Sequence, residues 1–524
     1  MAAPPHGLSL LVLATCIVCY YNSCNCGFVF DDISAIKDNR DLRPHTPIKN
    51  IFLNDFWGTP MHKVSGSLGT RTKHEQSHKS YRPLCVLSFR MNYSLHQLEP
   101  MGYHLVNMLL HSVVCLMYFR MCSMFLPEIS SFVAAMLFAV HPIHTEAVTG
   151  VVGRAETLSS VFFLAAFMFY CQATKHRRTT GWKPMGMAVL SVGTAMLCKE
   201  QGITIMGVCF VYELFVAQKL RLADVHQTVR SALGGKNAPI PWSPEASKRL
   251  GVLVASTLSL LFLRVQMMGA RLPVFTRFDN PASVAPTPIR QLTYSYLMSV
   301  NLWLLLFPCD LCCDWTMGTI PLLNSLADPR NLATLASFVS LLALAYVGLT
   351  TENRQQATVI IMSLAFMALP FLPASNLFFP VGFVVAERVL YIPSMGFCML
   401  VGYGWGLVAQ KRLKKLGWGF LGVLLVAHGC KTFSRNLDWE TEYSIFMAGL
   451  KVNHRNAKLF NNVGHALEGQ GRFNEALAYF QTAVRVQHDD VGAHINVGRT
   501  LNHLKMYKEA EEAYLKVNLH TLNL

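Results

Sequence analysis

Long apolar segments, separated by short polar loops, constrain this chain more than any other feature of its sequence. Hydrophobic residues make up 52% of the 524 residues, whereas charged residues make up only 14%. A typical soluble domain carries about 25% charged residues, so most of this chain is too apolar to fold as a soluble globule. The sequence therefore predicts a multipass membrane protein with helical spans.

Eleven segments are expected to cross the membrane. The first, at 8–21, is short for a spanning helix. It also resembles the core of a signal peptide, but it has no basic flank and no clear A-x-A cleavage site. We therefore favour a retained helix. The other ten spans are expected near residues 103–126, 130–148, 156–173, 184–198, 202–218, 250–268, 332–350, 357–373, 391–409 and 414–432.

Three basic runs predict the orientation of the spans, because Lys and Arg concentrate in cytoplasmic loops. They lie at 175–178, within 219–249 and at 410–415. We attribute the net charge of +15 to this topology and not to nucleic-acid binding. All three runs are cytoplasmic if residue 30 is luminal and if the apolar segment 292–307 is re-entrant or interfacial. The luminal parts are then 23–102, 141–156, 199–201, 269–331, 374–390 and everything after 432.

The fifteen cysteines do not predict a metal centre. Most of them, such as Cys115, Cys171, Cys198 and Cys209, lie inside apolar stretches and lack the CxxC…CxxC spacing of a zinc site. Neither a zinc site nor a disulfide framework is therefore expected from the sequence.

A 34-residue repeat follows the last span. The sequence NVG at 462–464 recurs at 496–498, and EA at 475–476 recurs at 509–510. This period is typical of tetratricopeptide repeats, which stack helical hairpins into a concave protein-binding surface. The two repeats in 456–524 fall short of the roughly three that a stable stack needs, so we expect a truncated array.

Polar motifs crowd the predicted luminal loops. FVFDDISAIKDNRDL follows the first span at 28–42, and the later loops contain HPIHTEAVTGVVGRAE at 141–156, CKEQGIT at 198–204 and SNLFFPVGFVVAERVLY at 375–391. Together these motifs resemble the transmembrane and tetratricopeptide repeat-containing O-mannosyltransferases of the endoplasmic reticulum. The resemblance extends from about residue 28 to the end of the chain.

The resemblance implies a fold and an activity. We expect an all-α polytopic membrane protein with a core like that of the C-type glycosyltransferases, followed by luminal tetratricopeptide repeats in an α-solenoid. The implied enzyme is a dolichyl-phosphate-mannose-protein mannosyltransferase of the endoplasmic reticulum membrane. Its donor, dolichyl-phosphate-mannose, is a substrate, and no cofactor is implied. Its acceptors are Ser and Thr of luminal proteins such as cadherin domains. The alternative is a membrane-anchored repeat scaffold without catalytic activity.

The expected domain organisation follows from the spans and the repeats. Residues 62–76, which are polar and rich in Gly and Ser, look like an insertion into the candidate catalytic loop, and they put activity in doubt if they disturb its fold. The expected parts are an N-terminal helix or signal anchor at 1–22, the first luminal loop at 23–102, the multipass core at 103–432, a linker at 433–455 and two repeats at 456–524.

The paired carboxylates of the first luminal loop are the candidate catalytic residues. In enzymes of the implied fold the base is an acidic residue of this loop, and Asp31 and Asp32 match that position. We favour Asp31 as the base and Asp32 as a structural residue. Two other interpretations remain open. Asp32 is suited to cap a helix that starts at Ile33. The second alternative is a calcium site whose ligands are Asp31, Asp32, Asp38 and Asp41.

Three cations beside luminal helix ends are candidates for binding the phosphate of the donor. Arg154, Lys199 and Arg388 have the charge and the hydrogen-bond donors that match phosphate oxygens. Each is also placed to extend toward the membrane interface. Ion pairs between Glu387 and Arg388, or between Lys199 and Glu200, are a further alternative.

Two further polar clusters are candidates for the donor site. His141, His144 and Glu146 resemble a metal-binding pattern, but Pro142 interrupts the helix and a convincing third ligand is missing. We expect these side chains to contact the donor sugar or the loop backbone, and we expect no metal. The second cluster contains an aromatic ring that is suited to stack on a sugar, although a packed loop explains it equally well; its members are His78, Lys79, Tyr81 and Arg82.

The predicted orientation is testable by cysteine-accessibility labelling in sealed microsomes. Cysteines introduced into 23–102 or 456–524 should be protected from a membrane-impermeant reagent, whereas those in 410–415 should react, because only the latter face the cytosol. Labelling near residue 470 from the cytosolic side would contradict the predicted number of crossings.

Overall fold

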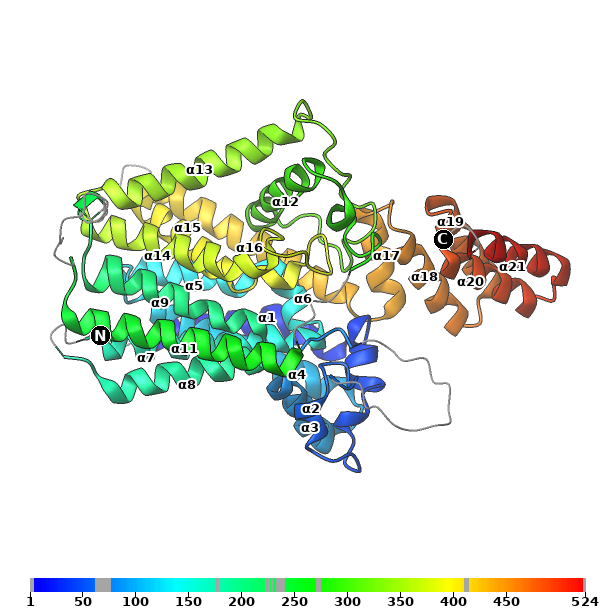
Figure 1. Ribbon diagram of the computed structural model, residues 1–524, viewed down its shortest axis with the longest axis horizontal. Helices are drawn as coiled ribbons and strands as arrows, with labels where there is room; N and C mark the ends of the chain where they lie inside the picture. Colours follow the sequence, from blue (N-terminus) through cyan, green and yellow to red (C-terminus); the bar gives the residue numbers. More distant parts are fainter. Residues whose placement is uncertain are drawn as a thin grey trace.

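The computed structural model describes residues 4–61, 77–175, 179–221, 241–269, 275–409 and 414–521, together with positions 224, 227, 230 and 231. Within these residues the protein is helical and contains no named strand. Figure 1 shows a bundle of long helices, a smaller helical layer against one end of it, and a helical array that continues to the C-terminus. The predicted all-α class is confirmed.

Each of the eleven predicted spans coincides with a helix of the bundle. Eight helical segments among the described residues are long and apolar enough to cross a membrane, and a pair bent by 49° makes a ninth. Two further bundle helices, α8 and α15, contain 17 residues each. The helices are α1 His6–Tyr20, α4 Pro100–Cys122, α5 Glu128–Val140 with α6 Thr145–Val148, α7 Arg154–Ala173, α8 Trp182–Cys198, α9 Ile205–Val211, α11 Pro244–Met268, α13 Arg330–Thr350, α14 Arg354–Phe371, α15 Pro393–Ala409 and α16 Lys414–Asp438.

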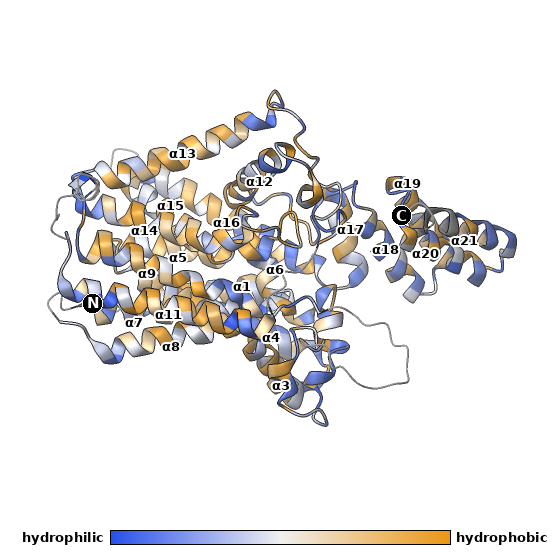
Figure 2. Ribbon diagram, in the orientation of Figure 1, coloured by the Kyte–Doolittle hydropathy of each residue, from blue (hydrophilic) through white to orange (hydrophobic). Residues whose placement is uncertain are grey.

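The outer helices of the bundle expose apolar side chains along their length. On α13, Leu332, Leu342 and Tyr346 each expose about two thirds of their surface, and Figure 2 shows that apolar residues dominate the bundle helices. Such a surface is unfavourable in water but suits hydrocarbon. The chain is therefore a membrane protein.

The segments predicted to be luminal gather at one end of the bundle. Figure 1 places the first loop, α6, α12 and the C-terminal array there. The apolar segment expected not to cross forms α12, Ile289–Leu306, which is not among the helices suited to span. The remaining first-loop helices are η2 Ile33–Lys37, η3 Arg40–Leu42, α2 Asn50–Leu53 and α3 Pro83–His96.

Aromatic packing fixes the first loop against the bundle. Phe28 and Phe89 pack against Tyr103 of α4, with ring centroids 5.2 and 6.4 Å apart. These rings belong to a buried cluster that also includes Phe56 and Val151. Because full burial of such a ring stabilises by roughly 1.5–3 kcal/mol, this cluster holds the paired carboxylates in place.

A buried ion pair joins three helical segments near the opposite end of the bundle. Arg249 of α11 donates to both carboxylate oxygens of Glu213, at 2.7 and 3.1 Å, and both side chains are fully buried. The hydroxyl of Tyr170, on α7, donates to the same carboxylate at 2.7 Å. Removing one partner of such a pair leaves an uncompensated charge in a low-dielectric interior.

The C-terminal array has the expected repeat geometry. Gly464 of α18 and Gly498 of α20 occupy the same repeat position, and a Cβ on either would lie within 3.0 Å of an aromatic ring, Phe480 or Tyr514. Glycine thus lets the two helices of each hairpin approach closely. The helices are α17 Glu442–Val452, α18 Ala457–Gly469, α19 Phe473–Val486, α20 Val491–His503 and α21 Tyr507–Thr521.

Most of the segment 433–455, predicted as a linker, is helical. Residues up to Asp438 continue α16, and α17 then starts at a capping box formed by Thr441 and Ser444. Ile445 of α17 is buried in the core that it shares with the repeats. The repeats are therefore joined to the bundle through a packed helix.

Candidate active site

The two paired carboxylates lie where the chain leaves the first span and turns. Phe30 has a positive φ of 55°, and the π-helical turn η2 follows directly. Successive residues of a helical turn point about 100° apart. Asp31 and Asp32 are therefore directed toward different surroundings.

Asp32 is a buried structural acceptor. Its Oδ1 accepts a hydrogen bond from the backbone N–H of Val152 at 2.8 Å, and its Oδ2 accepts one from Val29 at 3.3 Å. Burial raises the pKa of Asp32 to about 7, although these backbone donors oppose the shift. The helix-cap interpretation is wrong, because the side chain of Asp32 makes no cap hydrogen bond.

Asp31 faces a cation instead. Its Oδ2 accepts a hydrogen bond from Arg388 at 2.9 Å. The backbone N–H of Arg388 donates to the carboxylate of Glu146 at 2.9 Å. The side-chain Nε of Arg388 lies 3.5 Å from the same carboxylate. The side chain of Asp31 is 27% exposed, whereas that of Glu146 is 7% exposed. Arg388 therefore connects one accessible carboxylate with one buried carboxylate.

Charge balance keeps Arg388 protonated. Burial alone would lower its pKa, but Asp31 and Glu146 raise it. The proposed pair between Glu387 and Arg388 is wrong, because Glu387 accepts hydrogen bonds from the backbone N–H of Cys312 and from the indole of Trp315. Burial raises the pKa of Glu387 to about 8. Glu387 thus anchors the loop that follows α12.

Lys199 and Glu200 also have separate partners, so the proposed pair between them is not formed. Lys199 forms an ion pair with the buried Glu156 of α7. Glu200 accepts two hydrogen bonds from Arg82, at 3.1 and 2.6 Å. Arg264 of α11 approaches the same carboxylate at 3.5 Å.

Arg264 is a member of this charged cluster that was not predicted from the sequence. It is a single arginine within the apolar sequence LLFLRVQMM at 260–268, and a charge inside such a helix requires a partner or a ligand. That signal was available from the sequence. Its partners, Arg82 and Glu200, come from distant loops, so the cluster itself was not predictable.

The guanidinium of Arg154 is surrounded by groups of the protein. The residue is fully buried and donates to the side chain of Asn107 and to the carbonyls of Ser88 and Tyr103. Its guanidinium also lies 4.7 Å from the ring centroid of Phe89. Its donors therefore hold the first loop against α4, and this geometry gives no support to the expected phosphate-binding role.

The two histidines are core residues. His141 contacts the carbonyl of Leu305 at 3.1 Å and accepts the N–H of Ile143 at 3.3 Å. His144 lies 2.7 Å from the hydroxyl of Ser394. Both are buried, so they bind loop backbone and core side chains, one of the two expected alternatives, and are not placed to contact a sugar.

Neither of the two alternative ligand sets, the aspartates of the first loop for calcium or His141, His144 and Glu146 for another metal, is brought together among the described residues. The metal-binding side chains that do lie together come from α1 and α4. Lys79 donates to the carbonyl of Met61 at 2.9 Å, which fits the packed-loop interpretation. The expected insertion at 62–76 lies outside the described residues.

An apolar groove lies beside the charged cluster. It has a volume of about 440 Å³ and is formed by α9, α11, α14 and the segment after α14. Met206, Leu258, Leu261 and Leu369 are among its lining residues. Arg264 follows Leu261 by three residues, and therefore lies on the same helix face one turn nearer the polar end of the bundle.

Comparison with known proteins identifies the family. A model of the family described as Protein O-mannosyl-transferase TMTC, DUF1736 matches residues 269–342, and a tetratricopeptide repeat model matches residues 457–490. Protein O-mannosyl-transferase TMTC3 of Homo sapiens is 56% identical over 507 residues, covering 96% of this chain and 54% of that protein. The chain belongs to the TMTC family. Tmtc3 of Drosophila melanogaster is 55% identical, covering 97% of this chain and 58% of that protein.

The chain spans little more than half the length of these TMTC3 relatives. Among solved structures, the Archaeoglobus fulgidus oligosaccharyltransferase tethered with an acceptor peptide aligns with a TM-score of 0.38 and 10% identity, covering 90% of this chain and 58% of that chain. A score this low carries no argument about the fold or the function.

The pKa of Asp32 predicts how stability depends on pH. Its pKa rises from 3.8 to about 7 on folding, so between these values the folded state keeps a proton that the unfolded state has lost. The contribution of Asp32 to stability is therefore present at low pH and declines as pH rises toward 7. The melting temperature of the unmutated protein, relative to that of Asp32→Asn, should fall over this range.

The exposed Asp38, in the same loop, provides the control. Asp38→Asn makes the same substitution at an exposed position of this loop, so it controls for the loss of one carboxylate without the loss of buried hydrogen bonds. A melting-temperature difference for Asp32→Asn that stays constant from about pH 4 to about pH 7 would contradict the assignment.

Proposed function

We propose that this chain transfers mannose from dolichyl-phosphate-mannose to Ser or Thr of luminal proteins, such as cadherin domains, at the endoplasmic reticulum membrane. The observation that carries this proposal is the apolar groove beside the cluster of Arg82, Glu200 and Arg264. A polyprenyl donor has a hydrocarbon tail that stays in lipid and a sugar phosphate that stays at the polar surface. The groove and the cluster offer both environments side by side.

Arg264 and Arg82 are suited to bind the donor phosphate. Their side chains are 13% and 14% exposed, so they are partly desolvated but accessible. The two contacts of Arg264, to Glu200 and to the carbonyl of Tyr81, are both long at 3.5 Å. Its donors are therefore only weakly engaged and remain available for phosphate oxygens.

Asp31 is suited to accept the proton of the acceptor hydroxyl. It is more accessible than Asp32 and Glu146, and Arg388 holds its carboxylate in place. In the proposed step, the acceptor oxygen attacks the anomeric carbon of mannose and the bond to the phosphate oxygen breaks. The hydroxyl proton moves to Asp31, and the phosphate leaves with the electron pair. Arg388 and the two arginines of the groove stabilise the developing negative charge.

The arrangement of the loops supports two related proposals. We assign the bundle to the C-type glycosyltransferase fold, and we place the repeats in the lumen, where they would bind acceptor proteins. The first loop and the repeats lie at the same end of the bundle (Figure 1). A scaffold without activity would leave the groove and the accessible carboxylate without a role.

Replacing Asp31 tests the proposed base. Asp31→Asn keeps the size of the side chain but removes the proton acceptor, so mannose transfer to a cadherin domain by the purified protein should fall by roughly 10²–10⁴. Asp38→Asn changes an exposed carboxylate of the same loop and should leave transfer unchanged. An active, folded Asp31→Asn protein would place the base elsewhere, and an inactive unmutated chain would favour the scaffold.

Replacing Arg264 tests the donor site. Arg264→Gln should raise the KM for dolichyl-phosphate-mannose by roughly 10- to 100-fold, the loss of about one hydrogen bond between charged groups. The KM for the acceptor should not change. Lys248→Gln, at the other end of α11 and 59% exposed, is the matched control. Equal effects on donor and acceptor would argue against a phosphate contact.

A further inference from the structure

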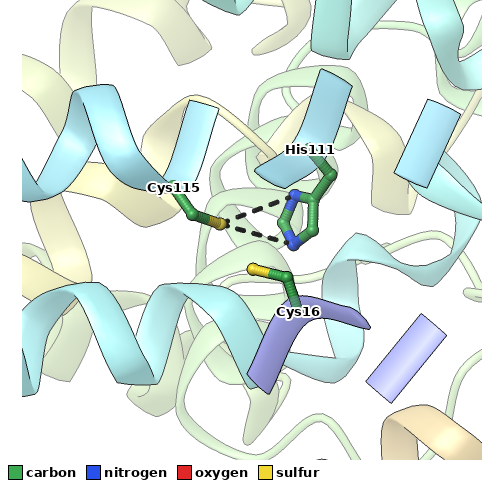
Figure 3. Close-up of side chains that lie close together, drawn as sticks. All are labelled: Cys16, His111 and Cys115. Carbon is green, nitrogen blue, oxygen red and sulfur yellow. Dashed lines mark hydrogen bonds between the residues drawn. The ribbon is translucent and has the colours of Figure 1, made fainter. Parts of the chain in front are cut away.

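Three metal-binding side chains meet in the core of the bundle, away from the charged cluster. Cys16 comes from α1, and His111 and Cys115 come from α4 (Figure 3). Their ligand atoms all lie within 4.8 Å of one another, and all three residues are fully buried. Fifteen cysteines without zinc-site spacing gave no sign of this cluster in the sequence.

Helix geometry explains how the cluster forms. His111 and Cys115 are four residues apart and therefore lie on one face of α4. Figure 3 shows Cys16 directed toward the same imidazole from the neighbouring helix. Nε2 of His111 lies 3.6 Å from Sγ of Cys115. Zinc bonds of about 2.3 Å to sulfur and 2.0 Å to nitrogen place such atoms about 3.5 Å apart in a tetrahedral site, which is close to this separation. The imidazole would turn about its side-chain bonds to direct Nε2 at the ion.

The surroundings of His111 are those of a metal ligand. Its Nδ1 lies 2.8 Å from the hydroxyl of Tyr391. When Nδ1 carries the proton, His111 donates to this hydroxyl and Nε2 keeps a lone pair. A metal-bound histidine usually fixes its other nitrogen in this way. Sγ of Cys115 lies beside the ring, 3.6 Å from Nε2 and 3.9 Å from Nδ1. In the other tautomer the hydroxyl of Tyr391 donates to Nδ1, and Nε2–H donates to the carbonyl of Ala139 at 3.4 Å. A metal at Nε2 would replace only this long hydrogen bond.

A buried tyrosine adds an unpartnered oxygen beside the cluster. The ring of Tyr20 lies with its centroid 5.0 Å from that of His111. Its hydroxyl is buried and has no hydrogen-bond partner in the described part of the chain. An unsatisfied buried hydroxyl is costly, and a polar or metallic ligand in this position would relieve that cost.

We propose that Cys16, His111 and Cys115 bind Zn²⁺. The two thiols release their protons on binding, so two thiolates, one neutral imidazole and one divalent cation give a site with no net charge. Neutrality favours zinc over Cu⁺ in an apolar interior, where net charge is expensive. The hydroxyl of Tyr20 is the candidate for the fourth position of the tetrahedron.

A bound ion would connect the N-terminal helix to the active site. It would link α1 to α4 directly, and it would fix His111 against Tyr391. Tyr391 follows Arg388 by three residues, and the two belong to one 3₁₀ turn, in which the backbone N–H of Tyr391 donates to the carbonyl of Arg388 at 3.2 Å. The ion would thus be a positioning element, because it does not touch the reacting groups.

Metal analysis of the full chain purified in detergent tests the proposal. Inductively coupled plasma mass spectrometry should find about one zinc per chain. The variants Cys16→Ala and Cys115→Ala should each lose this zinc. Cys122→Ala is the matched control, because Cys122 is also fully buried on α4 but lies outside the cluster. This variant should keep its zinc.

A second measurement does not require the variants to fold. Unmutated chain, stripped by a chelator and titrated with Co²⁺, should develop thiolate-to-cobalt charge-transfer absorption, and Zn²⁺ should abolish it. Its melting temperature should fall on chelation and recover with Zn²⁺. Folded protein with no bound metal and no cobalt signal would overturn the proposal. A disulfide between Cys16 and Cys115, or copper in place of zinc, would overturn it as well.

Discussion

A charge removed from water at the edge of a membrane needs an opposite charge or hydrogen-bonding groups, and this requirement governs both ends of the bundle. Near one end, Arg249 and Glu213 pair with each other in full burial. At the other end, the basic and acidic side chains of the first loop, α7, α11 and the 3₁₀ turn after α14 pair across elements that are far apart in sequence. The loops are thereby held in one arrangement, since the loss of one partner would leave the other charge buried and unpaired.

The neighbouring carboxylates Asp31 and Asp32 show how environment separates two identical side chains. Asp32 is buried, accepts two backbone hydrogen bonds and connects the first loop to the segment before α7. Asp31, one position earlier, stays accessible and meets Arg388. The same division separates Glu387, which anchors a loop, from Arg388. In both cases one member of the pair fixes the backbone, and the other keeps a partly exposed side chain.

The sequence was informative wherever a pattern is local. Apolar runs predicted the bundle helices, and the 34-residue period predicted the helical hairpins, because glycine is required at Gly464 and Gly498. It was uninformative about which charges meet. Arg154, Lys199 and Arg388 look alike in sequence. In the structure, however, Arg154 donates to backbone carbonyls and Lys199 pairs with Glu156. Such pairing depends on long-range packing, as does the contact of Cys16 with His111, which are 95 positions apart. Helix α17 lies in the segment predicted as a linker, and its burial depends on the core that it shares with the repeats.

The position of the groove has a consequence for how the proposed lipid-linked donor would reach this protein. The groove lies between α9, α11 and α14, whose exposed apolar side chains, such as Phe210 and Leu258, face the hydrocarbon. A lipid-linked sugar would enter sideways, by diffusion in the plane of the bilayer. Occupancy would then follow the mole fraction of the donor among membrane lipids and not its concentration in the aqueous lumen. Dilution of the membrane with other lipids, at constant total donor, would therefore slow the reaction, whereas a larger luminal volume would not.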